Sequence, residues 1–155
     1  MSSPVSIYDE DLQELVRDMT DTMYAARGIG LAAPQVGVNL RVIVIDIEGT
    51  DGGRDPLKLI NPRILFSEGR EKGEEGCLSI PGVTAVVERP RNIKVQAEDP
   101  GGKRLELKAE GTLARVICHE VDHLDGILYL DRISLLRRDV IKRKIKKLIK
   151  AGDWV

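Results

Sequence analysis

The chain of 155 residues is poor in cysteine, aromatic residues and histidine. Two cysteines cannot form a disulfide framework, and they suit a reducing interior in which a free thiolate can bind a metal ion. Five aromatic residues are too few for a base-stacking platform, which argues against binding of single-stranded nucleic acid. The sequence contains no apolar run of about 18 residues. Because its first residues are acidic, we also expect no secretory signal and a cytoplasmic location.

The only two histidines lie in one short segment, HEVDH over residues 119–123. One turn of an α-helix takes about 3.6 residues, so His119 and His123 are predicted to project from the same face. Two imidazoles placed in this way can bind one divalent cation, and Glu120 can reach a water molecule on that cation. The segment therefore has the H-E-x-x-H pattern of metal-dependent hydrolases. The alternative is an exposed helical turn that holds these residues by chance.

A catalytic site of this kind needs a third protein ligand and one open position. In the extended metalloprotease pattern the third histidine would fall at Tyr129, and a phenol is a poor substitute for an imidazole. No glutamate follows Gly126, so a downstream carboxylate ligand of that type is also excluded. Upstream, Cys77 offers a soft donor, although it also has the character of a small buried core residue. Cys118 competes, but neighbours on a helix point about 100° apart, which favours Cys77.

The apolar periodicity predicts an α+β fold, with small mixed or antiparallel sheets packed around a central metal-binding helix and with a C-terminal helix. Helices are expected over residues 9–27, 111–125 and 134–150. Strands are expected over residues 41–47, 57–66, 83–87, 93–97 and 105–109, and a short apolar one over 127–133. Loops or turns are expected over residues 28–37, 48–56 and 67–76.

Three segments resemble the signature motifs of the peptide deformylase family: GIGLAAPQVG at 28–37, EGCLS at 75–79 and HEVDHLDG at 119–126. They occur in the family's order, and the resemblance covers nearly the whole chain. It implies one deformylase-like catalytic domain over residues 1–155, with an N-terminal segment that is short relative to the family. A second departure is Cys118, at a position where the family often has glutamine.

This resemblance implies a metal-dependent hydrolase that removes the N-formyl group from the formyl-methionine of newly synthesised polypeptides and releases formate. Its partners would be N-formylmethionyl nascent peptides. Cys77, His119 and His123 would bind one divalent ion, which the resemblance suggests is iron(II), with zinc or nickel as alternatives.

The resemblance also assigns roles around the metal. Glu120 would be the general acid and base, while Gln35 and the backbone N–H of Leu78 would bind the developing oxyanion. Ile29 and Gly30 would line the mouth of the pocket for the methionine side chain. The residues agree with the role of Gln35, since it carries the one side-chain amide of an apolar loop and an oxyanion requires such a donor. The alternative for Gln35 is capping of nearby backbone.

Two other functions compete with this interpretation. A small metalloprotease would need a third ligand after Gly126, which is missing. A catalytically inactive, metal-stabilised binding module on the ribosome would need neither Glu120 nor Gln35. Turnover of a formyl-methionyl peptide would separate the three.

The C-terminal segment concentrates positive charge. Residues 137–150 hold eight basic residues and one acidic residue, a net charge of +7 in a chain whose total is −1. An apolar stripe is expected to hold this helix to the body: Ile141, Ile145, Leu148 and Ile149. The common interpretation is a solvated amphipathic terminus. The alternative is a docking helix for ribosomal RNA or protein near the exit tunnel, and removal of the residues after Ile133 would then spare turnover of a short peptide.

Overall fold

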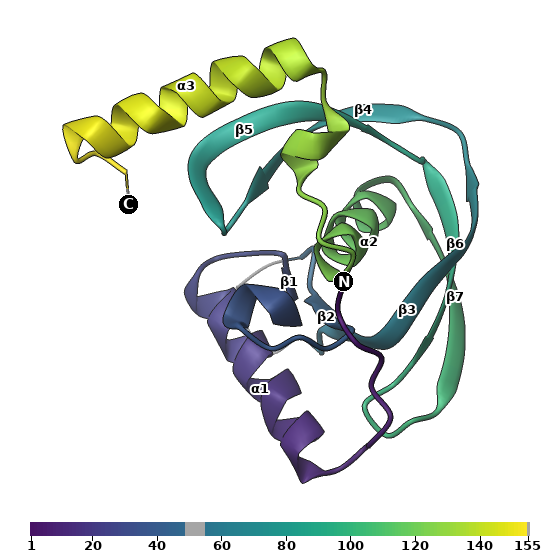
Figure 1. The fold of residues 1–155 in the computed structure, drawn as a ribbon. Helices are drawn as coiled ribbons and strands as arrows, with labels where there is room; N and C mark the ends of the chain where they lie inside the picture. The colour runs from purple at the N-terminus through teal and green to yellow at the C-terminus, as the bar shows by residue number, and fades with distance from the viewer. Residues whose placement is uncertain (49–54, 155) are drawn as a thin grey trace.

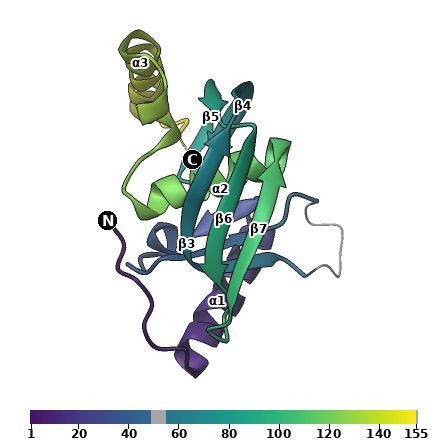
Figure 2. The same ribbon diagram turned by 90° about the vertical axis from the view of Figure 1, so that its right-hand side faces the viewer.

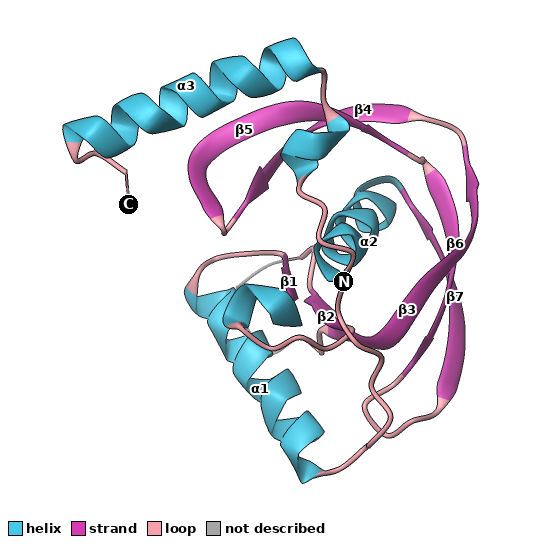
Figure 3. Cartoon of the chain, viewed as in Figure 1, coloured by secondary structure: helices cyan, strands magenta, loops and turns pink. Residues whose placement is uncertain are grey.

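The computed structural model describes residues 1–48 and 55–154, and its helices and strands are drawn in Figure 1 and Figure 3. The helices are α1 (Glu10–Ala25), η1 (Ala33–Val36), α2 (Gly111–Leu124), η2 (Tyr129–Arg132) and α3 (Leu135–Ala151), of which η1 and η2 are 3₁₀ helices. The strands are β1 (Gly30–Ala32), β2 (Val42–Ile45), β3 (Leu57–Glu68), β4 (Glu71–Cys77), β5 (Ile80–Arg89), β6 (Asn92–Glu98) and β7 (Arg104–Glu110). Within the loop expected over 48–56, residues 49–54 lie outside the described residues.

Two antiparallel sheets curve around the central helix α2 (Figure 1). The larger sheet has the strand order β1-β2-β3-β6-β7, and the smaller one consists of β4 and β5. Figure 2 shows β3, β6 and β7 side by side with α2 behind them. The pairs between these strands are antiparallel, and among the described residues a parallel contact is limited to one bridge between Ser3 and Leu40. The predicted α+β fold around a central helix is confirmed.

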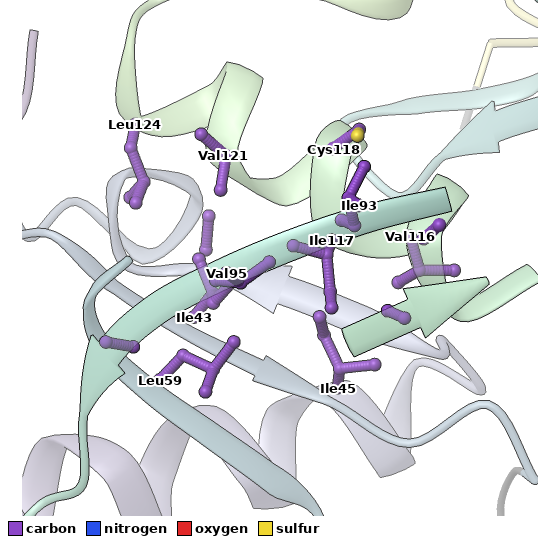
Figure 4. Close-up of a cluster of buried hydrophobic side chains, with 14 residues drawn as sticks. Ile43, Ile45, Leu59, Ile93, Val95, Val116, Ile117, Cys118, Val121 and Leu124 are labelled. Carbon is purple, nitrogen blue, oxygen red and sulfur yellow. The ribbon is translucent and has the colours of Figure 1, made fainter. Parts of the chain in front are cut away.

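The inner face of the large sheet packs against α2 through a cluster of buried aliphatic side chains (Figure 4). From α2 this cluster receives Ile117, Val121 and Leu124, and from the strands it receives residues such as Ile43 and Leu59. Cys118 belongs to the same buried cluster (Figure 4). Burial of these side chains fixes the rotation of α2, so the opposite side of the helix, with its histidines, faces the smaller sheet.

Helix α1 begins where the sequence predicts and ends slightly earlier. The Asp9 side chain caps it by accepting a hydrogen bond from the backbone N–H of Leu12 at 3.1 Å. The helix stops at Ala25, and Arg27 takes a left-handed backbone conformation with φ of 55° before Gly28. Its apolar face packs on β1 and β2 and thereby holds the first motif, which contains β1 and η1 where only a loop was expected.

Two further predicted segments are wrong. Residues 67–76 were expected as a turn, but they hold the end of β3 and nearly all of β4, with a turn only at Gly69 and Arg70. Backbone pairing with β5 makes this polar segment a strand, a contribution that side-chain hydrophobicity does not reveal. Residues 127–133 were expected as a strand and instead contain η2. Tyr129 and Leu130 lie on this short helix, and their side chains are buried against β5 without β-ladder pairing.

The C-terminal helix α3 is attached to the body through only part of its predicted apolar stripe. Ile141 and Ile145 are half-buried against β5 and η2, whereas Ile149 is 57% exposed, so the stripe is wrong at Ile149. The helix runs out along β5 and extends beyond it (Figure 1), and near its end Leu148 and Trp154 are partly buried. No helix in the described part of the chain is long and apolar enough to span a bilayer.

Candidate metal centre

The helical turn that carries both histidines is buried, so the alternative of an exposed turn is wrong. His119 and His123 are 9% and 8% exposed, and their Nε2 atoms lie 3.2 Å apart. Cys77, the last residue of β4, places its Sγ 3.3 Å from His123 Nε2. The three possible ligand atoms lie within 4.8 Å of one another. The structure therefore brings the three predicted ligands to one point and leaves Cys118 in the core.

The electrostatics of this cluster favour a thiolate. Burial alone would raise the pKa of Cys77, but hydrogen bonds with His119 and His123 outweigh it and lower that pKa to about 6. Burial would lower the pKa of His119, and its hydrogen bonds with Cys77 and Glu75 raise it instead. A thiolate with two imidazoles is a donor set that zinc, iron(II), nickel and cobalt all accept, so these residues fit a divalent cation.

Tyr129, at the position of the third histidine in the extended pattern, has another partner. Its hydroxyl donates a hydrogen bond of 2.9 Å to the carbonyl oxygen of Val83, and its side chain is buried. The ring stacks on His119, with the ring centres 6.0 Å apart. Tyr129 thus supports a ligand ring and does not itself supply a ligand.

Glu120 is a buried carboxylate with a free oxygen. It is 4% exposed, and its Oε2 has no hydrogen-bond partner in the part of the chain that the structure describes. Burial raises the pKa of Glu120 to about 7 against the opposing effect of the two neighbouring histidines. Because an unpaired buried carboxylate is costly, Glu120 beside three candidate metal ligands is a candidate functional residue.

The side chain of Gln35 caps nearby backbone, one of its two predicted roles, and its amide nitrogen remains on the side of Cys77. Its Oε1 accepts a hydrogen bond of 2.9 Å from the backbone N–H of Ala32 and so caps the local backbone. Its Nε2 donates to Ser79 Oγ at 3.0 Å and lies 3.6 Å from Cys77 Sγ. The capping oxygen therefore fixes the amide with its NH₂ group directed toward Ser79 and Cys77.

A cavity of about 750 Å³ opens beside these residues. Ile29 lies at its rim with 42% of its surface exposed, and Leu78 is 39% exposed next to Cys77. Gly30 lines the cavity where a side chain has no room: a Cβ there would lie 2.5 Å from Glu120 Oε1. The same added atom would lie 2.9 Å from Val116 Cγ1, so the absence of a side chain at Gly30 keeps Glu120 in place.

Behind His119 lies a carboxylate to which sequence reasoning gave no role. Glu75 is buried, and each of its oxygens has two partners. Its Oε1 accepts from Arg89 Nε at 2.8 Å and from Arg115 Nη1 at 2.9 Å. Its Oε2 accepts from Arg89 Nη2 at 3.0 Å and lies 2.9 Å from His119 Nδ1. A carboxylate on Nδ1 selects the tautomer whose Nε2 is free for a metal ion.

Burial would raise the pKa of Glu75, but hydrogen bonds with His119 and Arg89 lower it to about 2. One signal for Glu75 was present in the sequence, because residues i and i+2 of a strand face the same side and Glu75 precedes Cys77 by two. The expectation of a turn over residues 67–76 concealed it.

Arg89 and Arg132 both contact Asp122, at 2.6 Å and 2.7 Å, and give that buried acid its partners.

Comparison with known proteins agrees with this geometry. The profile of the family described as polypeptide deformylase matches residues 1–139. The peptide deformylase of Alkalilimnicola ehrlichii is 51% identical over 98% of this chain and 85% of its own length. A peptide deformylase of Legionella pneumophila superimposes with a TM-score of 0.90 at 46% identity, over 97% of this chain and 88% of that one. A peptide deformylase of Synechococcus elongatus in complex with actinonin gives 0.87 at 46% identity, over 99% and 82%.

Proposed function

The chain belongs to the polypeptide deformylase family, and on this basis we propose that it removes the N-formyl group from formyl-methionine at the start of new polypeptides. The products are formate and a free amino terminus. The observation that carries the proposal is the unpaired Glu120 oxygen beside Cys77, His119 and His123 at the wall of a cavity. Residues 1–155 would form one catalytic domain.

One divalent cation held by Cys77, His119 and His123 would supply Lewis-acid activation of the water and of the formyl carbonyl group. We propose iron(II) as this ion, with zinc or nickel able to replace it, since the thiolate and imidazole donors accept all three. Metal analysis of two cysteine variants tests the ligand set. Cys77→Ala is expected to lose its equivalent of tightly bound metal, and the core variant Cys118→Ala is expected to keep it. Full metal content in Cys77→Ala would remove Cys77 from the site.

The protein groups around the cation each have a distinct task. Glu120 takes a proton from the attacking water molecule while the oxygen of that water forms the new C–O bond. Glu120 then returns the proton to the amine nitrogen when the C–N bond breaks. The amide of Gln35 and the backbone N–H of Leu78 donate hydrogen bonds to the negative charge that develops on the formyl oxygen. Ile29 and Gly30 would line the mouth of the pocket for the methionine side chain.

A formyl carbon carries only hydrogen, and we infer that a site lined by Gly30 and Leu78 admits such a group better than an acetyl group. Formate release from a formyl-methionyl tripeptide, with the acetyl-methionyl tripeptide as control, tests both activity and selectivity. Gln35→Ala is expected to lower turnover by about 10²–10³, because one oxyanion donor is lost. Cleavage of the peptide bond itself would favour a metalloprotease, and no turnover of either peptide would favour a binding module.

We also propose that α3 docks on the ribosome, which implies a cytoplasmic location. Its eight basic residues are countered within the helix only by Asp139, and Arg138 is paired with Asp131 at 3.1 Å. The other charged side chains of the helix are exposed to solvent. Such a surface attracts the phosphates of ribosomal RNA, with an affinity that falls as salt rises.

Charge substitution tests docking more cleanly than truncation, because Ile141 and Ile145 cover part of the core beneath α3. The double variant Lys144→Glu with Lys147→Glu is expected to abolish ribosome co-sedimentation at low salt. The same charge change on the body, Lys103→Glu with Lys108→Glu, is expected to leave it intact. Both variants should retain wild-type turnover of a short peptide. Equal co-sedimentation of the two double variants would refute docking through α3.

A further inference from the structure

The metal ligands come from two elements that hydrophobic packing does not join. His119 and His123 lie on α2, which packs against the large sheet, whereas Cys77 ends β4 in the small sheet. The sequence of β4, EKGEEGC over residues 71–77, contains no apolar side chain other than Cys77 itself. Cys77 packs against the apolar cluster that contains Tyr129, but the rest of the strand has no apolar face to pack on α2, so polar contacts help to set the distance between the thiolate and the imidazoles.

Arg115 makes these contacts from α2. It lies four residues before His119 and eight before His123, so its side chain emerges from the same side of the helix. Its Nη2 donates to the carbonyl oxygen of Glu71 at 2.6 Å, and its Nη1 donates to that of Val87 at 2.8 Å. These bonds reach both strands of the small sheet. A third bond, to Glu75 Oε1 at 2.9 Å, acts on the carboxylate that touches His119, and a longer fourth bond goes to the carbonyl oxygen of Gly73 at 3.4 Å.

Gly73 provides the space for this guanidinium. A Cβ at Gly73 would lie 2.9 Å from both Cζ and Nε of Arg115. The guanidinium thus occupies the position that a side chain on the strand would take. Because it is the flexible end of its side chain, a methyl group at position 73 is expected to displace it and to leave the strand backbone where it is.

We propose that Arg115 is a positioning residue of the metal centre, and that the missing side chain of Gly73 on β4 leaves the space that its guanidinium occupies. Arg115 ties the strand that ends in Cys77 to the helix that carries the two histidines, and it holds Glu75 against His119. The inference rests on the proposed metal site. It predicts that loss of Arg115 loosens the cation, and that alanine at position 73 has the same effect by the same route.

The experiment measures how fast cobalt(II) leaves the cobalt-loaded protein in the presence of excess chelator, followed by the thiolate-to-cobalt charge-transfer absorption. Arg115→Ala and Gly73→Ala are each expected to raise the release rate by about 10–100-fold, the usual range for the loss of an outer partner of a metal ligand. The double variant is expected to release cobalt no faster than Arg115→Ala alone. Arg115→Lys should release cobalt at a rate between those of the wild-type protein and Arg115→Ala, since one ammonium group cannot reach Glu75 and two backbone carbonyls together.

Two controls match these variants. Gly76 is nearer to Cys77 in the sequence than Gly73 is, but the carbon added in Gly76→Ala would make an ordinary contact, 3.5 Å from Thr84 Cγ2. This variant should release cobalt at the wild-type rate. Arg63→Ala removes an exposed arginine of β3 and should also have no effect.

Wild-type release from Arg115→Ala, or effects of the two single variants that multiply in the double variant, would overturn the inference. If circular dichroism shows that Arg115→Ala does not fold, wild-type release from both Arg115→Lys and Gly73→Ala would overturn it. Failure of the wild-type protein to bind cobalt would instead refute the proposed metal site.

Discussion

Helices α2 and α3 have similar lengths and opposite environments. Ten of the 14 residues of α2 are buried, among them His119, Glu120, Asp122 and His123, whereas none of the 17 residues of α3 is. Buried polar groups require partners, and α2 has them: Glu75 for His119, and two arginines for Asp122. The exception is the free oxygen of Glu120. In α2 the unpaired oxygen lies beside the candidate metal ligands. In α3 most charged side chains face solvent, Arg138 pairs with Asp131 while its Nε is buried without a partner among the described residues, and the informative feature is the excess of positive charge.

The largest predicted effect comes from substituting the unpaired glutamate of α2. Glu120→Gln is expected to keep the fold and the metal but to lower turnover by about 10²–10⁴, because glutamine cannot accept the proton of the attacking water. The matched change on α3, Lys144→Gln, should leave turnover of a short peptide unchanged. Formate release measures both. Retention of more than about a tenth of wild-type activity by Glu120→Gln would exclude Glu120 as the base.

The next effect concerns one acid on each helix. Asp122→Ala leaves the buried guanidinium of Arg89 without one of its acids and is expected to cost about 3–5 kcal/mol of stability. Asp139→Ala removes an exposed acid and should change stability by less than about 0.5 kcal/mol. Urea denaturation followed by circular dichroism measures the difference. Similar midpoints for the two variants would contradict a structural role for the Asp122 cluster.

A smaller effect compares apolar side chains. Ile117 is fully buried between α2 and the large sheet, so Ile117→Ala should cost about 2–5 kcal/mol through lost burial and an unfilled cavity. Val140 is 59% exposed on α3, and Val140→Ala should change the stability by less than about 0.5 kcal/mol. Thermal denaturation of both proteins at one salt concentration provides the test, and a large loss in Val140→Ala would mean that α3 packs more tightly than its exposure indicates.

The smallest predicted effect concerns the ion pair between α3 and the body of the protein. Arg138 pairs with Asp131 at 3.1 Å, with side chains 28% and 44% exposed. Such a pair is screened by water, so Arg138→Ala should cost about 0.2–1 kcal/mol, and part of this cost should disappear at high salt. A salt-independent loss would indicate that the arginine stem, and not its charge, holds the helix.

Apolar periodicity predicted most elements of this fold because burial of one face was their main signal. Thus α1, with Leu12, Val16 and Met23 buried, and the fully buried β2 were both predicted. The same reasoning failed for β4, whose polar and glycine-rich sequence is a strand only because β5 pairs with its backbone. It failed again for η2, where apolar residues reach the core from a short 3₁₀ helix.

By itself the sequence determined the local part of the metal centre. Four residues separate His119 from His123, and the hydrogen bonds of one helical turn are enough to bring their rings together. Helix geometry in the sequence also favoured Cys77 over Cys118, but only the tertiary structure shows how Cys77 joins the histidines, since β4 delivers it from 42 residues before His119 while Cys118 is held in the core. The tertiary structure also decided that Arg115 and Glu75 stand behind these ligands. Contacts between distant segments depend on strand register and on the packing of α2 against two sheets. The spacing of four residues between the histidines predicts neither.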